Sequence, residues 1–238
     1  VQFNTYTVPM WYLYMLIGLY LYMPFFSAWI EKADLKQKNT FLAIWAVTLF
    51  LPYAYSFFSD YLFGISAWNS FGTFYYFAGF NGYLLLGYYL AKDLKAWSWT
   101  KALLVAVPLF VVGYSATYVG FKSMTAHPNI TEEQLELFFL YCSPNVVCMT
   151  VAVFLVVRQV RIRTSFWTGV FAHITKCGLG IYFIHYFVVG FGYWVAEVLH
   201  IPVSLKIPVT AAVVFAICWV VVGLFYRIVP GASKWIFG

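Results

Sequence analysis

The chain has 238 residues, of which 63% are hydrophobic and only 9% charged, and its formal net charge is +6. A soluble domain carries about 25% charged residues, so the composition excludes a water-soluble globule and indicates an integral membrane protein whose main partner is the lipid bilayer. The cations lie in short segments between apolar stretches, with no basic run interleaved with aromatic residues, so we expect no nucleic-acid partner.

Seven apolar stretches are each long enough to cross a bilayer, which takes about 20 helical residues. We therefore expect an all-α, polytopic membrane helix bundle that forms a single transmembrane domain over residues 1–238. Pro24 is expected to end the first helix, and Thr168–Cys177 to form a short surface helix before the sixth. In chain order the expected helices are Pro9–Phe26, Thr40–Phe58, Phe74–Leu90, Ala102–Phe121, Leu135–Val157, Gly178–Leu199 and Val209–Val229.

Several of these stretches contain helix breakers or amide side chains. Pro52 is expected to kink the second helix, and Pro144 lies inside the fifth beside Asn145. Asn81 is a polar residue within the third and needs a partner. Irregular backbone is tolerated at membrane depth only where it is buried in protein or lines a cavity, so these positions favour a bundle with an internal pocket over a passive anchor.

The lysines and arginines predict the orientation. Twelve of the 14 lie in the first, third and fifth connectors and the C-terminal tail, and two lie in the other three connectors. Because cytoplasmic loops carry the excess of cations, this alternation predicts an N-terminus outside and a C-terminus inside.

The sixth stretch, GLGIYFIHYFVVGFGYWVAEVL, carries His185 near its middle. An intramembrane histidine is costly to expose to lipid, so it should face protein or a water-filled cavity. Two interpretations remain open at this point: His185 binds substrate or relays a proton in a polar cavity, or it hydrogen-bonds a neighbouring helix and only fixes packing. Glu197, near the far end of the stretch, is interpreted as an interfacial residue.

A cluster of cations follows the fifth stretch on the expected inner face. It is either a topology determinant that contacts anionic lipid, or a docking site for a phosphorylated cytosolic cofactor. The four histidines show no HxxxH or HExxH spacing, so we expect no metal site. The cations of this cluster are Arg158, Arg161, Arg163 and Lys176.

Four segments, taken in order, resemble the acyltransferase-3 family of bacterial integral membrane proteins. They are MWYLYMLIGLYLYMPFF, FNGYLLLGYYLA, GLGIYFIHYFVV and PGASKWIFG. The third segment is similar to a late family helix and places His185 on a family histidine. The chain is most similar to bacterial sugar and polysaccharide O-acetyltransferases, which implies a place in the bacterial inner membrane.

The resemblance implies a fold and an activity. Family members are expected to have about ten helices and to move an acyl group, commonly acetyl from acetyl-CoA, to a sugar hydroxyl on the other face. The chain would supply the last seven helices, with three expected upstream that carry the leading catalytic histidine. Arg158-Gln159-Val160-Arg161 matches the family RxxR motif in letters, but not in place. Within the chain the resemblance implies His185 as the catalytic candidate, and Trp11, Asn81 and Tyr182 as cavity-lining residues.

A seven-helix transporter or receptor without catalysis is the alternative. Seven spans with the N-terminus outside is a receptor pattern, but the last stretch has no lysine for a retinal Schiff base and no NPxxY segment. A transporter usually shows paired halves with matched broken helices, and the chain has no convincing internal repeat.

Overall fold

The computed structural model describes residues 11–57, 76–126, 130–231 and 233, and these residues contain helices but no strand. Five segments within them are long and apolar enough to cross a membrane. The predicted all-α, polytopic membrane fold is therefore confirmed. These five segments are Trp11–Lys32, Trp99–Thr125, Gln134–Val157, Ser165–Val198 and Val203–Ile228.

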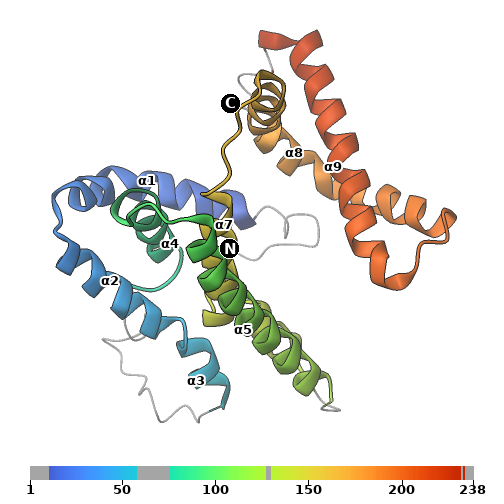
Figure 1. Ribbon diagram of the computed structural model, residues 1–238. Coiled ribbons are helices and arrows are strands. Elements are labelled where there is room, and N and C mark those ends of the chain that lie inside the picture. Colours follow the sequence, from blue (N-terminus) through green and yellow to red (C-terminus); the bar gives the residue numbers. More distant parts are fainter. Residues whose placement is uncertain (1–10, 58–75, 127–129, 232, 234–238) are drawn as a thin grey trace. The chain divides into compact units, whose positions relative to one another are not determined.

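The chain forms two compact units, one of Val1–Met15 with Ile162–Gly238 and one of Leu16–Arg161. Helix α1 (Trp11–Lys32) begins in the first unit and continues into the second (Figure 1). The sequence predicted that Pro24 ends this helix, and that prediction was wrong. Phe26 and Ile30, beyond the proline, are buried against Leu85, and this packing stabilises the last turns.

In the unit Leu16–Arg161, the second expected span is divided into two helices. Helix α2 (Leu35–Thr48) begins at a capping box in which Asp34 and Gln37 satisfy each other's backbone N–H groups. Helix α3 (Leu51–Phe57) carries Pro52 in its first turn, where a missing N–H costs no hydrogen bond. Pro52 thus starts a new helix and does not kink a continuous one.

The third expected span is also shorter than predicted in the described residues. Helix α4 (Asn81–Tyr88) continues into a π-helix, η4 (Tyr89–Asp93), and residues 74–75 lie outside the described residues. The indole of Trp45 packs directly on Gly82, so a side chain there would collide with it. With these two spans divided or short, the count of seven and the orientation remain predictions.

Helix α5 (Trp99–Thr125) matches the fourth expected span, extended at both ends. The fifth is interrupted, because α6 (Glu132–Glu136) and the 3-10 turn η5 (Leu137–Phe139) are followed by a separate helix, α7 (Pro144–Val157). Pro144 occupies the first position of α7, as expected for a residue without an N–H donor. α5 and α7 lie side by side (Figure 1).

In the other unit, α8 (Ser165–Val198) and α9 (Val203–Ile228) form an antiparallel hairpin (Figure 1). The predicted surface helix and the sixth span form one continuous helix. No proline interrupts the backbone hydrogen bonds between residues 165 and 198. At about 1.5 Å per residue, the 34 residues of α8 exceed the roughly 30 Å hydrocarbon core. The connection is a Schellman turn with His200 at φ 51° and the Ile201 N–H bonded to the Ala196 carbonyl.

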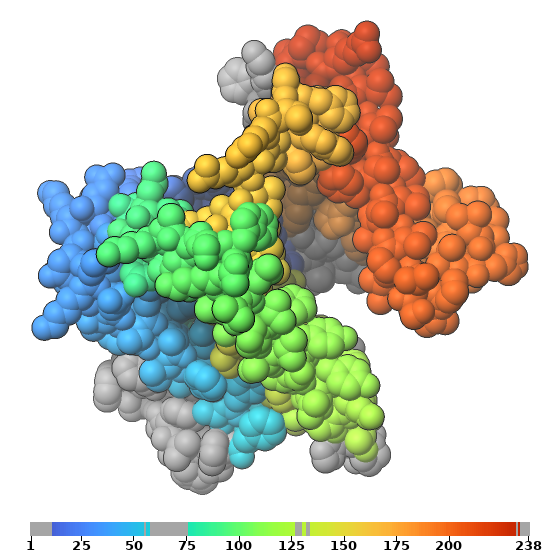
Figure 2. Space-filling view, in the orientation of Figure 1, coloured from blue at the N-terminus to red at the C-terminus, as the bar shows by residue number. Residues whose placement is uncertain are grey.

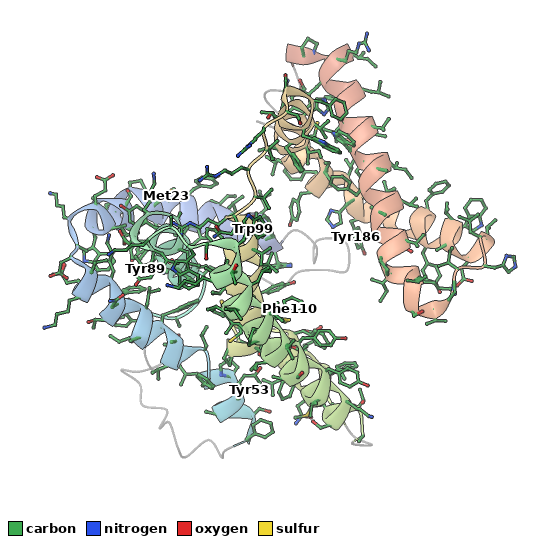
Figure 3. The ribbon with its side chains drawn as sticks, viewed as in Figure 1. Met23, Tyr53, Tyr89, Trp99, Phe110 and Tyr186 are labelled. Carbon is green, nitrogen blue, oxygen red and sulfur yellow. The ribbon has the colours of Figure 1, made fainter. Side chains whose placement is uncertain are left out.

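Large apolar side chains cover the outer faces of these helices. Leu104 and Val112 of α5 are 71% and 62% exposed, and Ile207 of α9 is 80% exposed. Figure 2 shows uncovered faces of α5 and α9, and Figure 3 shows Phe110 projecting from α5. Such surfaces are stable in lipid and costly in water, in agreement with a membrane protein.

Candidate functional site

His185 lies near the middle of α8 and is half-buried. Its Nδ1 is 2.5 Å from the backbone carbonyl oxygen of Tyr182, one turn earlier. A carbonyl oxygen only accepts, so this contact requires Nδ1 to carry the proton and to donate it. The other ring nitrogen, Nε2, then holds a lone pair and can accept a proton from a hydroxyl group.

The structure brings Tyr182 and His185 of the expected residues into contact, and it links Trp11 to them through Tyr12. The ring of His185 lies 5.5 Å from that of Tyr182, which packs edge-on against Tyr12 of α1 at 5.2 Å. Tyr12 in turn packs against Trp11 at 6.1 Å. We call Trp11, Tyr12, Tyr182 and His185 the aromatic site. Tyr12 was missed from the sequence, although it stands one residue from Trp11 in the same segment.

Asn81 is not part of this group. It occupies the first turn of α4, in the unit Leu16–Arg161, whereas the aromatic site belongs to the other unit. Asn145, the second amide flagged in the sequence, is 5% exposed and uses its side chain for contacts inside its own unit. The sequence associates Asn145 with an internal pocket. In the structure its side chain instead bonds neighbouring protein groups and contributes to packing.

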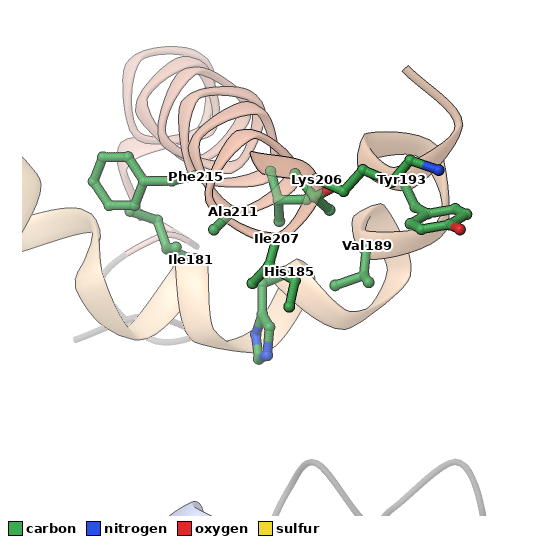
Figure 4. A pocket seen from close by; sticks show the side chains of 10 residues that line it. Ile181, His185, Val189, Tyr193, Lys206, Ile207, Ala211 and Phe215 are labelled. Atoms are coloured by element: carbon green, nitrogen blue, oxygen red, sulfur yellow. The ribbon is translucent and has the colours of Figure 1, made fainter. Parts of the chain in front are cut away.

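A groove of about 430 Å³ runs between α8 and α9. His185 contributes to its wall, but in Figure 4 the imidazole ring points away from Ala211 and Phe215 of α9. The helix α8 thus presents the aromatic site and the groove in different directions. The residues that line the groove are Ile181, His185, Val189, Tyr193, Lys206, Ile207, Thr210, Ala211, Val214 and Phe215.

Arg158, the first of the predicted cofactor-binding cations, is largely committed to structure. Its Nη2 donates to the backbone carbonyl of Leu94 at 2.7 Å, which ties the end of α7 to the end of the π-helix η4. Its Nη1 is buried and has no hydrogen-bond partner among the described residues. Lys38, expected in a loop, is instead buried in α2 and paired with Asp93 at 2.9 Å.

The other three predicted cations, Arg161, Arg163 and Lys176, are exposed. The Lys176 ammonium lies 4.5 Å from the centroid of the Tyr226 ring, within the range of a cation–π interaction. Arg161 belongs to the unit Leu16–Arg161, and the other two belong to the unit that contains α8. The structure therefore keeps three of the four cations accessible to an anionic ligand.

His173, on the same helix as His185, has the opposite hydrogen-bonding role. Its Nδ1 accepts from the indole N–H of Trp219 at 2.8 Å, so its proton resides on Nε2. Cys177 lies 3.8 Å from the same nitrogen. The two histidines cannot be told apart from the sequence, because the tautomer of His173 depends on Trp219 of α9.

These observations define a polytopic helical membrane protein with a polar, hydrogen-bonded histidine at membrane depth. Comparison with protein families matches residues 1–225 to the acyltransferase-3 family, described as an acyltransferase domain. The chain belongs to the acyltransferase-3 family. Comparisons with curated proteins and with solved structures gave no match.

Family membership makes the chain a membrane acyltransferase, and it favours the enzyme over the receptor or transporter alternative. No three histidine, cysteine or acidic side chains gather at metal-binding distances within the described part of the chain. His185 is a histidine of α8 whose Nδ1 contacts the Tyr182 carbonyl, which leaves Nε2 as the nitrogen suited to act on a hydroxyl.

Proposed function

We propose that the protein moves an acyl group, in the first instance acetyl, from acyl-CoA to a hydroxyl of an extracytoplasmic sugar or glycan at the bacterial inner membrane. Membership of the acyltransferase-3 family supports the reaction class. The orientation of His185, with Nδ1 held by the Tyr182 carbonyl, is the observation that carries the proposal. The excess of cations on alternate connectors supports donor entry from the inner face.

In the proposed reaction, the acceptor hydroxyl attacks the thioester carbonyl, an ester C–O bond forms and the C–S bond breaks. The hydroxyl proton moves to Nε2 of His185 and then to the departing thiolate, which leaves as the free thiol of CoA. The Tyr182 carbonyl accepts from Nδ1 throughout and stabilises the imidazolium. General acid–base assistance of this kind contributes about 10²- to 10⁴-fold in rate.

The remaining predicted residues have binding roles in this proposal. Trp11 and Tyr182 are assigned to contact the acceptor next to His185, with Tyr12 packed against both rings. Asn81, in the unit Leu16–Arg161, is the exception and is assigned no role at the aromatic site. Arg161, Arg163 and Lys176 attract the phosphates of the donor, and Arg158 holds the connector that carries two of them.

The first experiment measures transfer of radiolabelled acetyl from acetyl-CoA to glycan in membranes that contain the full-length gene product. We expect His185→Gln to lower kcat by about 100-fold or more with little change in KM, because glutamine can donate to the Tyr182 carbonyl but has no basic nitrogen. His200→Gln, in the exposed α8–α9 turn, is the matched control. Wild-type turnover in His185→Gln would remove the histidine from the chemistry.

The second experiment tests the donor site. The triple variant Arg161→Gln, Arg163→Gln and Lys176→Gln should raise KM for acetyl-CoA several-fold while kcat is retained, because these side chains are assigned to binding alone. Lys122→Gln, at the far end of α5, is the control with one cation removed elsewhere. An unchanged KM in the triple variant would contradict the assignment.

A further inference from the structure

The groove between α8 and α9 changes in polarity along its length. At the end next to the α8–α9 turn it is lined by Lys206 and Tyr193, and one helical turn deeper by Thr210. Beyond Thr210 the lining side chains are apolar except His185, whose ring points away from Ala211 and Phe215, and Phe215 and Ile181 lie at the far end (Figure 4). A cation, then a hydroxyl, then hydrocarbon is the order of groups that complements an amphiphile lying along the membrane normal.

The length of the groove agrees with one leaflet of a bilayer. Lys206 and Phe215 are nine positions apart on α9, which corresponds to about 14 Å at 1.5 Å per residue. Half of a hydrocarbon core of roughly 30 Å is about 15 Å. The groove therefore suits the acyl chains of a single lipid whose headgroup lies at the α8–α9 turn.

Thr210 provides an unused hydrogen-bonding group inside this groove. Its hydroxyl oxygen is buried and has no partner among the described residues. Threonine hydroxyls in helices commonly bond to the carbonyl one turn earlier, as Thr150 does with Val146 at 2.8 Å. Buried hydroxyls are normally paired, whereas this oxygen has no partner among the described residues and almost no accessible surface. A rotation about χ1 turns it toward the groove, where an ester carbonyl one helical turn below a headgroup phosphate can accept from it.

The charges at the mouth of the groove specify the headgroup. The Lys206 ammonium forms an ion pair with the Glu197 carboxylate and lies 5.6 Å from the centroid of the Tyr193 ring. The pair is neutral overall and offers one positive and one negative group. A zwitterionic headgroup matches both, with its phosphate at Lys206 and its ammonium at Glu197, which is 45% exposed. A purely anionic headgroup would meet the carboxylate without a counter-charge.

We propose that the α8–α9 groove is a binding site for one phosphatidylethanolamine molecule. Its phosphate pairs with Lys206, its ammonium with Glu197, and an ester carbonyl accepts from the Thr210 hydroxyl, while its chains lie along Val214 and Phe215. The groove shares His185 with the aromatic site, but its polar mouth lies at the α8–α9 turn. The site goes beyond the proposed acyl transfer because it holds a structural lipid and no reactant.

The test is native mass spectrometry of the full-length protein released from nanodiscs of equal parts phosphatidylethanolamine and phosphatidylglycerol. We expect the wild type to retain one phosphatidylethanolamine in at least fivefold excess over phosphatidylglycerol. Lys206→Met and Thr210→Val should each lower its retention at least threefold. Glu197→Gln should shift the preference toward phosphatidylglycerol, because the anionic headgroup then meets no carboxylate.

Lys122→Met and Val153→Thr serve as controls, the second placed in the apolar groove between α5 and α7. Both should retain the lipid as the wild type does. Equal retention of the two lipids by the wild type, or unchanged retention in Lys206→Met and Thr210→Val, would overturn the proposal. Thermal unfolding of each variant confirms that it is folded, and the reversal expected for Glu197→Gln cannot arise from unfolding. None of these readouts uses acyl transfer, so they are independent of the proposed activity.

Discussion

The α5–α7 pair and the α8–α9 pair are built alike but use their polar groups differently. In the first pair, Asn145 donates to the Thr117 hydroxyl at 2.7 Å and the Phe138 carbonyl at 2.8 Å, and it accepts from Tyr53 (labelled in Figure 3) at 2.6 Å. The groove beside this pair, about 280 Å³, is lined only by alanine, valine and phenylalanine. The Asn145 side chain between these helices is satisfied by protein and serves structure, while the unpartnered Nη1 of Arg158 lies at the end of α7.

In the α8–α9 pair, hydrogen-bonding capacity is left over. The Thr210 hydroxyl has no partner in the described part of the chain, and the tautomer of His185 leaves Nε2 as an acceptor. Buried polar groups in native proteins are normally paired, so capacity left over beside a groove indicates a ligand. Two equally apolar helix pairs therefore differ in whether their few polar atoms are hydrogen-bonded within the protein or remain available to a ligand.

The largest effect on stability is expected from Asn145→Leu. Losing its hydrogen bonds leaves the Phe138 carbonyl without that donor and the Tyr53 hydroxyl with only its contact to Ser143, which should cost about 2–3 kcal/mol in free energy of unfolding. Thermal unfolding in detergent, followed by tryptophan fluorescence, measures the loss. Thr175→Val, which removes an exposed intrahelical bond in α8, should cost less than about 0.5 kcal/mol. Equal losses in the two variants would contradict the structural role of Asn145.

The next largest losses of stability are expected from alanine substitutions at the glycines where two helices approach closely. A methyl group added at Gly113 would lie 2.5 Å from the Asn145 backbone oxygen, and one at Gly192 would lie 2.6 Å from a methyl of Val214. Because backbone yields less than a side chain, Gly113→Ala should cost about 2 kcal/mol and Gly192→Ala about 1 kcal/mol. Gly190→Ala, with nothing within 4 Å, should be neutral. The same thermal assay applies, and a reversed order of the first two would contradict the packing described.

Thr210→Val sharpens the contrast with Asn145. Because its hydroxyl has no protein partner, its removal should leave the free energy of unfolding unchanged or raise it by less than about 1 kcal/mol. The measurement is made in detergent without added phospholipid, so that no lipid contributes. A loss above 1 kcal/mol would mean that the hydroxyl is used within the folded chain after all.

Modest effects of opposite sign are expected from two substitutions at the α8–α9 turn. His200 adopts φ 51°, a left-handed conformation that costs a side-chain-bearing residue about 1–2 kcal/mol. His200→Gly should therefore raise the free energy of unfolding by about 0.5 kcal/mol after the larger entropy loss of glycine, whereas His200→Val should lower it by about 1 kcal/mol. Identical melting temperatures for the two variants would contradict the turn geometry.

The sequence predicts the long apolar helices well, because α5, α8 and α9 carry strong and continuous hydropathy. It predicts interruptions less well. Pro52 and Pro144 begin helices at their first turns, whereas Pro24 lies inside α1, where packing of Phe26 outweighs the lost hydrogen bond. Proline marks a possible break, and only the neighbouring helices decide whether one occurs.

Some features of the candidate site could be predicted from the sequence, and others depend on the folded chain. His185, Tyr182 and Trp11 were predicted, since a histidine within an apolar stretch and a matching family segment are visible in one dimension. The tautomer of His185 and the unused hydroxyl of Thr210 were not, because each depends on which acceptors lie nearby in the folded chain. The burial of Lys38 against Asp93 was missed for the same reason, since 55 residues separate the two.

The most direct test of the central claim compares His185→Gln with His173→Gln in the acetyl-transfer assay. The two histidines share one helix, but the free Nε2 of His185 is an acceptor whereas His173 accepts through Nδ1 from Trp219. The account predicts a kcat lowered about 100-fold or more in His185→Gln and by less than about threefold in His173→Gln, at matched amounts of folded protein. Equal rates in the two variants would contradict it.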